Sequence, residues 1–225
     1  MTTLTIAPLA PLLDRLFGEA DASDPENDAV FATYWAGLLD DDKARVIRSK
    51  TEYTDVYSRM KCIPLAVSRE TGLLLYILAR GAGASSIVEF GTSFGLSTLC
   101  LAAALRDNGG GRLVTSEFEP SKIARAKENL AARGLVDLVE FREGDALETL
   151  ARDLPETIDM LFLDGAKSLY AGILDRAESH LRPGAFVVAD NADLCPEYLA
   201  RVRDPKHGYL SVPFAEDVEL SMRIG

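Results

Sequence analysis

The stretch SIVEFGTSFGLST, residues 86–98, decides the fold of this chain. A short apolar, β-branched run over residues 86–90 ends at Gly91, which is typical of a strand buried inside a sheet. A helical pattern begins at Leu96, so Gly91 and Gly95 bound a tight strand-to-helix turn. The stretch therefore predicts the first strand, turn and helix of a βαβ unit.

The same alternation of strand and helix patterns continues to the C-terminus. Further strand-like runs are RLVTSE (112–117), LVEFRE (138–143), IDMLFLD (158–164), AFVVAD (185–190), GYLSVPF (208–214) and VELSMRI (218–224). Strands that alternate with helices of 10–15 residues predict right-handed crossovers and a parallel sheet covered on both faces. The last two runs are close enough to form a hairpin. We expect a seven-stranded, doubly wound, Rossmann-like α/β sheet, mostly parallel, with an antiparallel edge strand.

Residues 1–62 do not show this alternation of strand and helix patterns. They show helical apolar spacing over residues 9–17, an acidic turn-prone stretch over 21–28, and a second helical pattern over 29–40. We interpret residues 1–62 as an N-terminal helical extension packed on the core, and residues 63–225 as the main domain.

The bulk composition is that of an ordinary globular protein with one full-sized domain, because 48 % of the 225 residues are hydrophobic and 26 % charged. The formal net charge of −11 argues against a partner held mainly through phosphates, and so against nucleic acid. Cys62, Cys100 and Cys195 show neither disulfide-framework nor zinc-site spacing. No apolar run approaches the about 20 residues that span a bilayer. We expect a soluble, cytoplasmic protein.

Acidic residues follow nearly all of the predicted strands. They are Glu89, Glu117, Asp145, Asp164 and Asp190. In an open parallel sheet, ligands bind at the carboxyl ends of the strands, where these side chains stand. Such crowding of carboxylates is costly unless something cationic lies among them.

The glycine turn after the first strand and Glu117 after the second strand indicate an adenosine ligand. Glycines let a ligand approach the backbone, and an acid at the end of the next strand accepts hydrogen bonds from both ribose hydroxyls. A nicotinamide dinucleotide fits both features, and such a turn alone also occurs where a helix merely packs on a strand. Glu89 distinguishes these ligands, because its carboxylate repels a pyrophosphate and attracts the sulfonium and ammonium of S-adenosylmethionine. The sequence favours S-adenosylmethionine.

Asp164, Asp190 and Asn191 predict a divalent-cation site. They end strands that should be neighbours, about 5 Å apart. Oxygen ligands without His or Cys suit Mg²⁺, with Mn²⁺ or Ca²⁺ as alternatives. The competing interpretation is that the aspartates cap the following helices. Lys167, at the start of the next helix, is a candidate base because a nearby cation and the helix dipole would both lower the pKa of its amine.

The stretches VEFGTSFGLST, LVTSEFEP, MLFLDGAKSLY and GAFVVADN resemble the cation-dependent class I O-methyltransferases. That family contains the catechol and caffeoyl-CoA O-methyltransferases and many bacterial members. The resemblance covers residues 60–225. Its most specific part is the spacing LD-x-x-K-x-x-Y, followed about twenty residues later by ADN.

The resemblance implies a role for each matching position. The implied cofactor contacts are Val67, Glu89, Gly91, Thr92, Ser97, Glu117, Phe118, Gly144, Asp145, Ala146 and Asp164. Among them, Glu117 takes the ribose hydroxyls, and Phe118 lies against the adenine. The implied metal ligands are Asp164, Asp190 and Asn191, and the implied catalytic residues are Lys167 and Asp164. Family members pair through the helical extension, so a homodimer is expected.

The expected reaction is direct in-line methyl transfer to a hydroxyl of a small aromatic acceptor with vicinal hydroxyls, which chelates the metal. Three alternatives remain: methylation of a hydroxylated nucleoside in RNA, a nicotinamide-dependent oxidoreductase, and a non-catalytic cofactor-binding protein. Loss of the metal ligands or of Lys167 would signal the last of these, and neither is lost.

The acceptor side of the site carries no readable signature. Gly165 and Ala166 replace a bulky pair of the animal catechol enzymes, so catechol itself is not implied. Residues 51–63 and the loop after Asn191 are expected to face the acceptor. Phe31, Tyr34 and Trp35 have helical spacing and are interpreted as packing within the extension.

Overall fold

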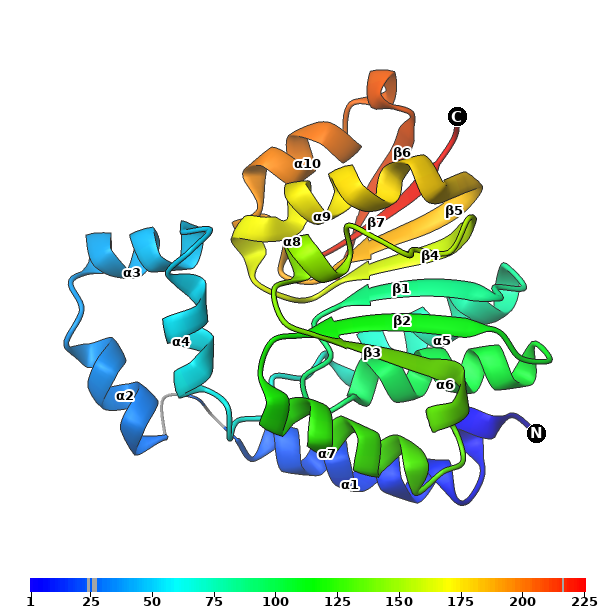
Figure 1. The fold of residues 1–225 in the computed structure, drawn as a ribbon, viewed down its shortest axis with the longest axis horizontal. Helices are drawn as coiled ribbons and strands as arrows, with labels where there is room; N and C mark the ends of the chain where they lie inside the picture. The colour runs from blue at the N-terminus through cyan, green and yellow to red at the C-terminus, as the bar shows by residue number, and fades with distance from the viewer. Residues whose placement is uncertain (24, 26–27, 216) are drawn as a thin grey trace.

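A seven-stranded mixed β-sheet forms the centre of the protein (Figure 1). The structure is a computed structural model that describes residues 1–23, 25, 28–215 and 217–225. The strands are β1 (Ser86–Phe90), β2 (Arg112–Glu117), β3 (Val139–Glu143), β4 (Ile158–Leu163), β5 (Leu181–Ala189), β6 (Tyr209–Phe214) and β7 (Val218–Arg223). Their order across the sheet is β3-β2-β1-β4-β5-β7-β6.

The predicted Rossmann-like arrangement is confirmed. Strands β1 to β5 are parallel, and β7 pairs antiparallel with both β5 and β6. Within the C-terminal hairpin, β7 is therefore the antiparallel strand, and β6 on its outer side is the edge. The strand order reverses between β1 and β4, and ligands bind at the carboxyl ends of the strands at such a reversal.

Helices cover both faces of the sheet. They are α1 (Leu9–Asp21), α2 (Ala29–Ala36), α3 (Asp40–Arg48), α4 (Tyr53–Arg59), α5 (Arg69–Gly81), α6 (Leu96–Asp107), α7 (Pro120–Ala131), α8 (Ala146–Thr149), α9 (Tyr170–Ala177) and α10 (Pro196–Val202). Helices α1, α5, α6 and α7 pack on one face, and α8, α9 and α10 on the other (Figure 1). Because successive strand residues point to opposite faces, Ile87 belongs to one core cluster and Val88 to the other. None of the helices in the described part of the chain is long and apolar enough to cross a membrane.

The predicted helical extension divides into two parts. Helix α1 buries Leu9, Leu12 and Leu16 in the main core. Helices α2, α3 and α4 instead share a small cluster of their own, which consists of Phe31, Val46, Val56, Met60 and Ile63. The acidic turn predicted over residues 21–28 contains residues 24, 26 and 27, which lie outside the described residues.

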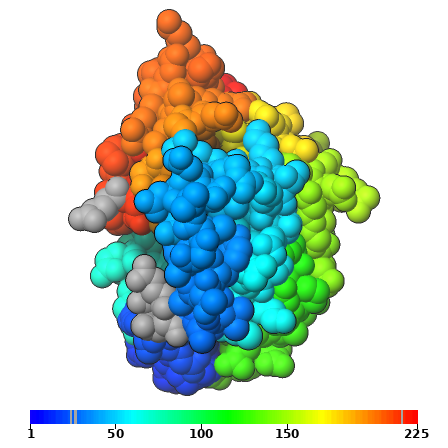
Figure 2. Space-filling view, turned by 90° about the vertical axis from the view of Figure 1, so that its left-hand side faces the viewer, coloured from blue at the N-terminus to red at the C-terminus, as the bar shows by residue number. Residues whose placement is uncertain are grey.

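Helices α2, α3 and α4 lie apart from the sheet, on the side of the carboxyl ends of its parallel strands. Figure 1 shows them beside the rest of the molecule, and Figure 2 shows them from the side, spread between α1 below and α10 above. Tyr53 and Tyr57 of α4 line a cavity together with Phe90 and Glu117, which end β1 and β2. This three-helix unit therefore covers the carboxyl ends of the strands.

Candidate active site

The loops after β1 and β4 are in direct contact at the reversal of strand order. The backbone N–H of Asp164 donates to the carbonyl of Phe90 at 2.8 Å. Gly91 has a φ of 104°, and a Cβ on it would lie 2.5 Å from the carbonyl oxygen of Asp164. Only glycine combines this backbone conformation with so close an approach. The predicted cofactor turn and the predicted metal ligand therefore lie side by side.

A cavity opens between these loops and α4. The predicted cofactor contacts that line it are Gly91, Glu117, Phe118, Gly144, Ala146 and Asp164. Tyr53 closes one wall, with its ring edge-on to that of Phe118 at a centroid distance of 6.1 Å. The enclosed space is about 50 Å³.

Glu117 lies on the floor of this cavity. Its Oε2 accepts the backbone N–H of Ser93 at 3.0 Å, and its Oε1 accepts those of Phe118 and Glu119 at 3.0 and 3.1 Å. These three bonds hold the carboxylate at the mouth of the glycine turn, where it can accept hydrogen bonds from a ribose.

Glu89, Thr92 and Ser97 form a layer beneath the cavity. Glu89 is completely buried, and its Oε2 accepts the hydroxyls of Thr98 at 2.7 Å and Thr115 at 2.6 Å. Its other oxygen, Oε1, has no hydrogen-bond partner among the described residues. Burial raises the pKa of the Glu89 carboxyl to about 7, although the hydroxyls lower it. The buried hydroxyl of Thr92 contacts that of Thr115 at 2.6 Å.

Two further predicted cofactor contacts lie away from the cavity lining. Val67 is buried in the main core beside α5 and α6. Asp145 is exposed and caps α8, accepting the N–H of Leu147 at 2.8 Å. For Asp145, the structure therefore shows the helix-capping role that competes with a ligand-binding role.

The predicted metal ligands meet at the ends of β4 and β5. These strands are neighbours, with Leu163 beside Ala189, so Asp164 and Asp190 follow at adjacent tips. The two carboxyl groups are close enough for each to affect the pKa of the other. Burial, and then the Asp164 charge, raise the pKa of Asp190 to about 7. Two acids in this state require compensation by a cation or by a shared proton.

Asn191 is oriented by its backbone and by Asp217. It adopts a left-handed conformation, with a φ of 48°, which Asn tolerates better than most residues. Its Nδ2 donates to Oδ2 of Asp217 at 3.0 Å. Because Asp217 binds the amide nitrogen, the amide oxygen of Asn191 points elsewhere and is available to a cation. Residues behind a metal ligand commonly orient it in this way.

Lys167 occupies the same corner. Its ammonium donates to Oδ1 of Asp164 at 3.0 Å and to the hydroxyl of Tyr170 at 2.9 Å. Tyr170 in turn donates to the carbonyl of Asp190 at 2.8 Å. Burial by itself lowers the pKa of Lys167, but Tyr170 and Asp164 raise it well above its usual range. In the absence of a cation, the Asp164 carboxylate thus holds the proton on the amine. The lowered pKa predicted from the sequence depends on a nearby cation and stays a prediction.

The donor set suits a hard cation. No three His, Cys, Asp or Glu side chains in the described part of the chain converge as a metal-binding group, so the third protein ligand would be the amide of Asn191. Asp164 and Asp190 place two acids here, and Asp217 lies behind Asn191; among the described residues the only salt bridge of these three acids is that of Asp164 with Lys167. A dication would balance the remaining charge, and oxygen donors favour Mg²⁺, Mn²⁺ or Ca²⁺.

Comparison with known proteins fits this geometry. A family model described as a methyltransferase domain matches residues 88–192. The crystal structure of the O-methyltransferase TomG of Streptomyces achromogenes, in complex with S-adenosylmethionine, is 30 % identical and superposes with a TM-score of 0.64 over 86 % of this chain and 95 % of TomG. The chain belongs to the class I, S-adenosylmethionine-dependent O-methyltransferase family.

Curated relatives of this chain include catechol O-methyltransferases. That of Niastella koreensis is 38 % identical over 56 % of this chain and 58 % of its own length. Catechol O-methyltransferase B of Danio rerio is 31 % identical over 73 % of this chain and 64 % of its own. The chain thus spans somewhat more than half the length of the curated relatives that it matches. An O-methyltransferase of Bacillus cereus, solved with S-adenosylhomocysteine and 21 % identical, shares the fold, with a TM-score of 0.63 over 92 % of this chain and 99 % of its own.

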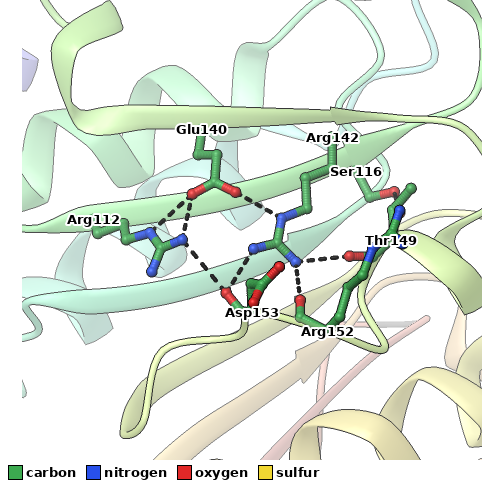
Figure 3. Close-up of polar contacts among 7 residues, drawn as sticks. All are labelled: Arg112, Ser116, Glu140, Arg142, Thr149, Arg152 and Asp153. Atoms are coloured by element: carbon green, nitrogen blue, oxygen red, sulfur yellow. Dashed lines mark hydrogen bonds and ion pairs between the residues drawn. The ribbon is translucent and has the colours of Figure 1, made fainter.

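Arg142 of β3 ties this strand to the segment that follows α8 (Figure 3). Its guanidinium donates to the carbonyl oxygens of Thr149 (2.7 Å), Arg152 (2.6 Å) and Asp153 (2.7 Å). It also pairs with Glu140 at 2.8 Å. The side chain is only 9 % exposed. These bonds fix the segment after α8, and with it the turn before α8 that lines the cavity.

A second, larger cavity of about 440 Å³ adjoins the metal corner. Lys167, Asn191 and Leu194 line its inner end, and the rest of its lining includes Phe31, Trp35, Val46, Ile47, Val56, Tyr57 and Met60. Val56, Tyr57 and Met60 of the segment 51–63 line this cavity, as does Leu194 of the loop after Asn191. That these segments face the acceptor stays a prediction. Phe31 and Trp35 do more than pack the extension, because they also form its wall.

A signal for this wall was present in the sequence. Helix α2, AVFATYWA, is apolar nearly all round, although only Phe31 in it is buried. A helix of that kind normally lies inside a core. One that leaves its apolar side chains partly uncovered has surface available for a ligand.

Proposed function

We propose that this protein transfers the methyl group of S-adenosylmethionine to a hydroxyl of a small aromatic acceptor with vicinal hydroxyls, and that a divalent cation held by Asp164, Asp190 and Asn191 binds those hydroxyls. One observation carries the proposal: Asp164 lines the cofactor cavity and also adjoins Asp190 and Lys167. Asp164 would therefore border both the binding site of the methyl donor and that of the acceptor. The catechol O-methyltransferase relatives support the same substrate class.

The residues present fit a divalent cation. Asp164 and Asp190 converge as a buried pair, and Asp217 leaves the amide oxygen of Asn191 free for such an ion. A bound dication would lower the pKa of a phenolic hydroxyl from about 10 toward neutrality. Mg²⁺ is the expected ion, because all of these donors are oxygens.

Side chains of the protein supply the remaining steps. Glu117 fixes the ribose of the methyl donor, and Phe118 and Tyr53 enclose its adenine. Lys167 steers the hydroxyl and, as an ammonium, stabilises the oxyanion that attacks the methyl group. Its amine would take up the hydroxyl proton where a bound cation competes for Asp164 and so lowers the Lys167 pKa. Holding the two reactants in line accounts for most of the expected rate gain.

Labelled S-adenosylmethionine with catecholic acceptors tests this function. Activity should require Mg²⁺ and vanish in EDTA, and Asp164→Ala should lose it at least about 1,000-fold. Asp164→Ala should still bind S-adenosylhomocysteine within about tenfold of the wild type by calorimetry, because the ribose contacts remain. Asp175→Ala, at an exposed salt bridge on α9, is the matched control. Equal turnover in EDTA would exclude the proposed mechanism.

Two further expectations stay proposals. Hydroxylated nucleosides belong in the same acceptor panel, since methylation of RNA is the alternative activity. The expected homodimer is checked by light scattering of the eluted protein, and the expected cytoplasmic location by cell fractionation.

A further inference from the structure

The 440 Å³ cavity beside the metal corner is far larger than a single ring requires. An apolar cavity of about 150 Å³ holds one benzene molecule, so this volume corresponds to about three such rings. Drug-sized ligands occupy pockets that begin at about 300 Å³. The space therefore matches an acceptor of two or three fused or linked rings.

The walls of the cavity are aromatic and aliphatic. Val46, Val56 and Met60 are buried in the three-helix unit that forms the outer wall. Phe31 and Trp35 stack on each other with their ring centroids 5.5 Å apart and an interplanar angle of 19°, and the Lys43 ammonium lies over the Trp35 ring at 5.7 Å. Both rings line the cavity, so they present aromatic carbon to an occupant, and such walls favour aromatic rings through burial of apolar surface.

Polar groups of the lining gather at one end. Lys167 and Asn191 stand where the cavity meets the metal corner, and Lys167 is the one charged side chain among the described lining residues. An occupant would therefore place its hydroxyl groups at that end and apolar rings beneath α2 and α3. The place of these polar groups would fix the orientation of the acceptor, and the volume of the cavity would limit its size.

Resting on the proposed function, we propose that the natural acceptor is a planar, multi-ring aromatic compound with vicinal hydroxyls on its terminal ring. The remaining rings lie in the part of the 440 Å³ cavity that α2, α3 and α4 line, which we call the acceptor chamber. Catechol itself fills only the inner end of this chamber. Trp35 and Ile47 determine acceptor size and touch no reacting atom.

A size series of acceptors tests the proposal. Catechol, dihydroxynaphthalene and dihydroxyanthracene, each with vicinal hydroxyls at the ring end, are compared at saturating S-adenosylmethionine and Mg²⁺. We expect kcat/KM to rise about tenfold with each added ring, because each ring buries further apolar surface. Catechol as the best substrate would overturn the proposal.

Two variants locate the effect in the chamber. Ile47→Glu puts a carboxylate into the lining, and Trp35→Ala removes an aromatic side chain from it. Both should lower kcat/KM at least about tenfold for the three-ring acceptor and less than about threefold for catechol. Val30→Glu, on the neighbouring exposed surface of α2 (62 % exposed), is the control for added charge. Equal losses for all three acceptors would contradict a size-determining role.

A binding measurement separates this proposal from the proposed function. The dimethyl ether of dihydroxyanthracene cannot donate a proton and chelates metal poorly, so its binding in EDTA reports the chamber alone. Calorimetry should show binding to the wild type and at least about tenfold weaker binding to Ile47→Glu. Trp35 is the only tryptophan, so its fluorescence lifetime reports occupancy directly. Binding of the ether without methyl transfer to any acceptor would contradict the proposed function but not the proposed acceptor size. Metal-dependent transfer to catechol without binding of the ether would contradict the proposed acceptor size but not the proposed function.

Discussion

Gly91 lies directly against the main-chain carbonyl of Asp164, so that a β-carbon at position 91 would come within 2.5 Å of that oxygen. The turn of the proposed cofactor site and the strand end of the proposed metal site thus share one backbone contact. Neither loop can shift without the other. This contact explains why the two halves of the proposed chemistry sit at a fixed separation.

Gly91→Ala tests this coupling. The substitution adds a clash with backbone to the strain of a positive φ, so we expect a loss of at least about 3 kcal/mol in the free energy of unfolding. Gly83→Ala is the matched control, since Gly83 also has a positive φ but has open space around its Cβ position. That control should lose about 1 to 2 kcal/mol. Urea denaturation measures both, and equal losses would show that the contact is unimportant.

Glu89 should make stability depend on pH. Its pKa is about 7 in the folded protein and about 4.5 in the unfolded chain, so the folded state holds the proton more tightly. This contribution is complete below pH 4.5 and is lost as the pH rises through 7. Over that range it amounts to about 3 kcal/mol, at 1.36 kcal/mol per pKa unit.

Glu89→Gln removes this ionisation and keeps an acceptor for Thr98 and Thr115. The variant should therefore show a smaller decline in unfolding free energy between pH 5 and pH 8 than the wild type, as measured by urea titrations. It should also bind S-adenosylmethionine about tenfold more weakly, because a negative charge near the sulfonium is lost. An unchanged pH profile would show that Glu89 is ionised throughout.

Arg142→Ala should destabilise the wall of the cofactor cavity. Removing the guanidinium removes three hydrogen bonds to carbonyl groups, of which, among the described residues, only that of Asp153 keeps another side-chain donor, Arg112 at 3.4 Å, and each lost bond of this kind costs about 1 kcal/mol or more. We expect a loss of about 3 kcal/mol and weaker cofactor binding. Arg112→Ala, which removes the more exposed partner of the same Glu140, should lose less than about 1 kcal/mol.

Lys167→Met should lower kcat by about 100-fold or more, while the affinity for S-adenosylhomocysteine stays within about threefold. Lys167→Arg keeps the positive charge and should recover part of the rate if oxyanion stabilisation dominates. Tyr170→Phe, which removes a hydrogen bond to Lys167 but no charge, is the control and should cost less. Rates come from single-turnover assays with labelled cofactor, and full activity of Lys167→Met would remove the residue from the mechanism.

The sheet and its switch point could be predicted from the sequence because hydrophobic periodicity and strand-helix alternation are local signals. Asp164 and Asp190 were placed together by the same logic, since consecutive parallel strands are usually neighbours. The layer that Glu89 forms beneath the cavity could not be predicted in this way, because whether a strand-end side chain points inward depends on register. The direction of the Lys167 pKa shift could not be predicted either, because it depends on the contact with Asp164.

The acceptor chamber was the least predictable part of the site. It depends on how α2, α3 and α4 enclose space, and the sequence shows only that Phe31 and Trp35 share a helical pattern. A packed core and an open cavity produce the same periodicity. The size of the space between the helices is a property of tertiary packing alone.

Crystals soaked in Mn²⁺ with S-adenosylhomocysteine give the most direct test of the proposed metal site, through an anomalous difference map. One peak should lie between the carboxylates of Asp164 and Asp190 and the amide oxygen of Asn191, with Lys167 displaced from Asp164 or sharing it. No peak at that corner, with the ammonium of Lys167 still bound to Asp164 at saturating Mn²⁺, would contradict the account.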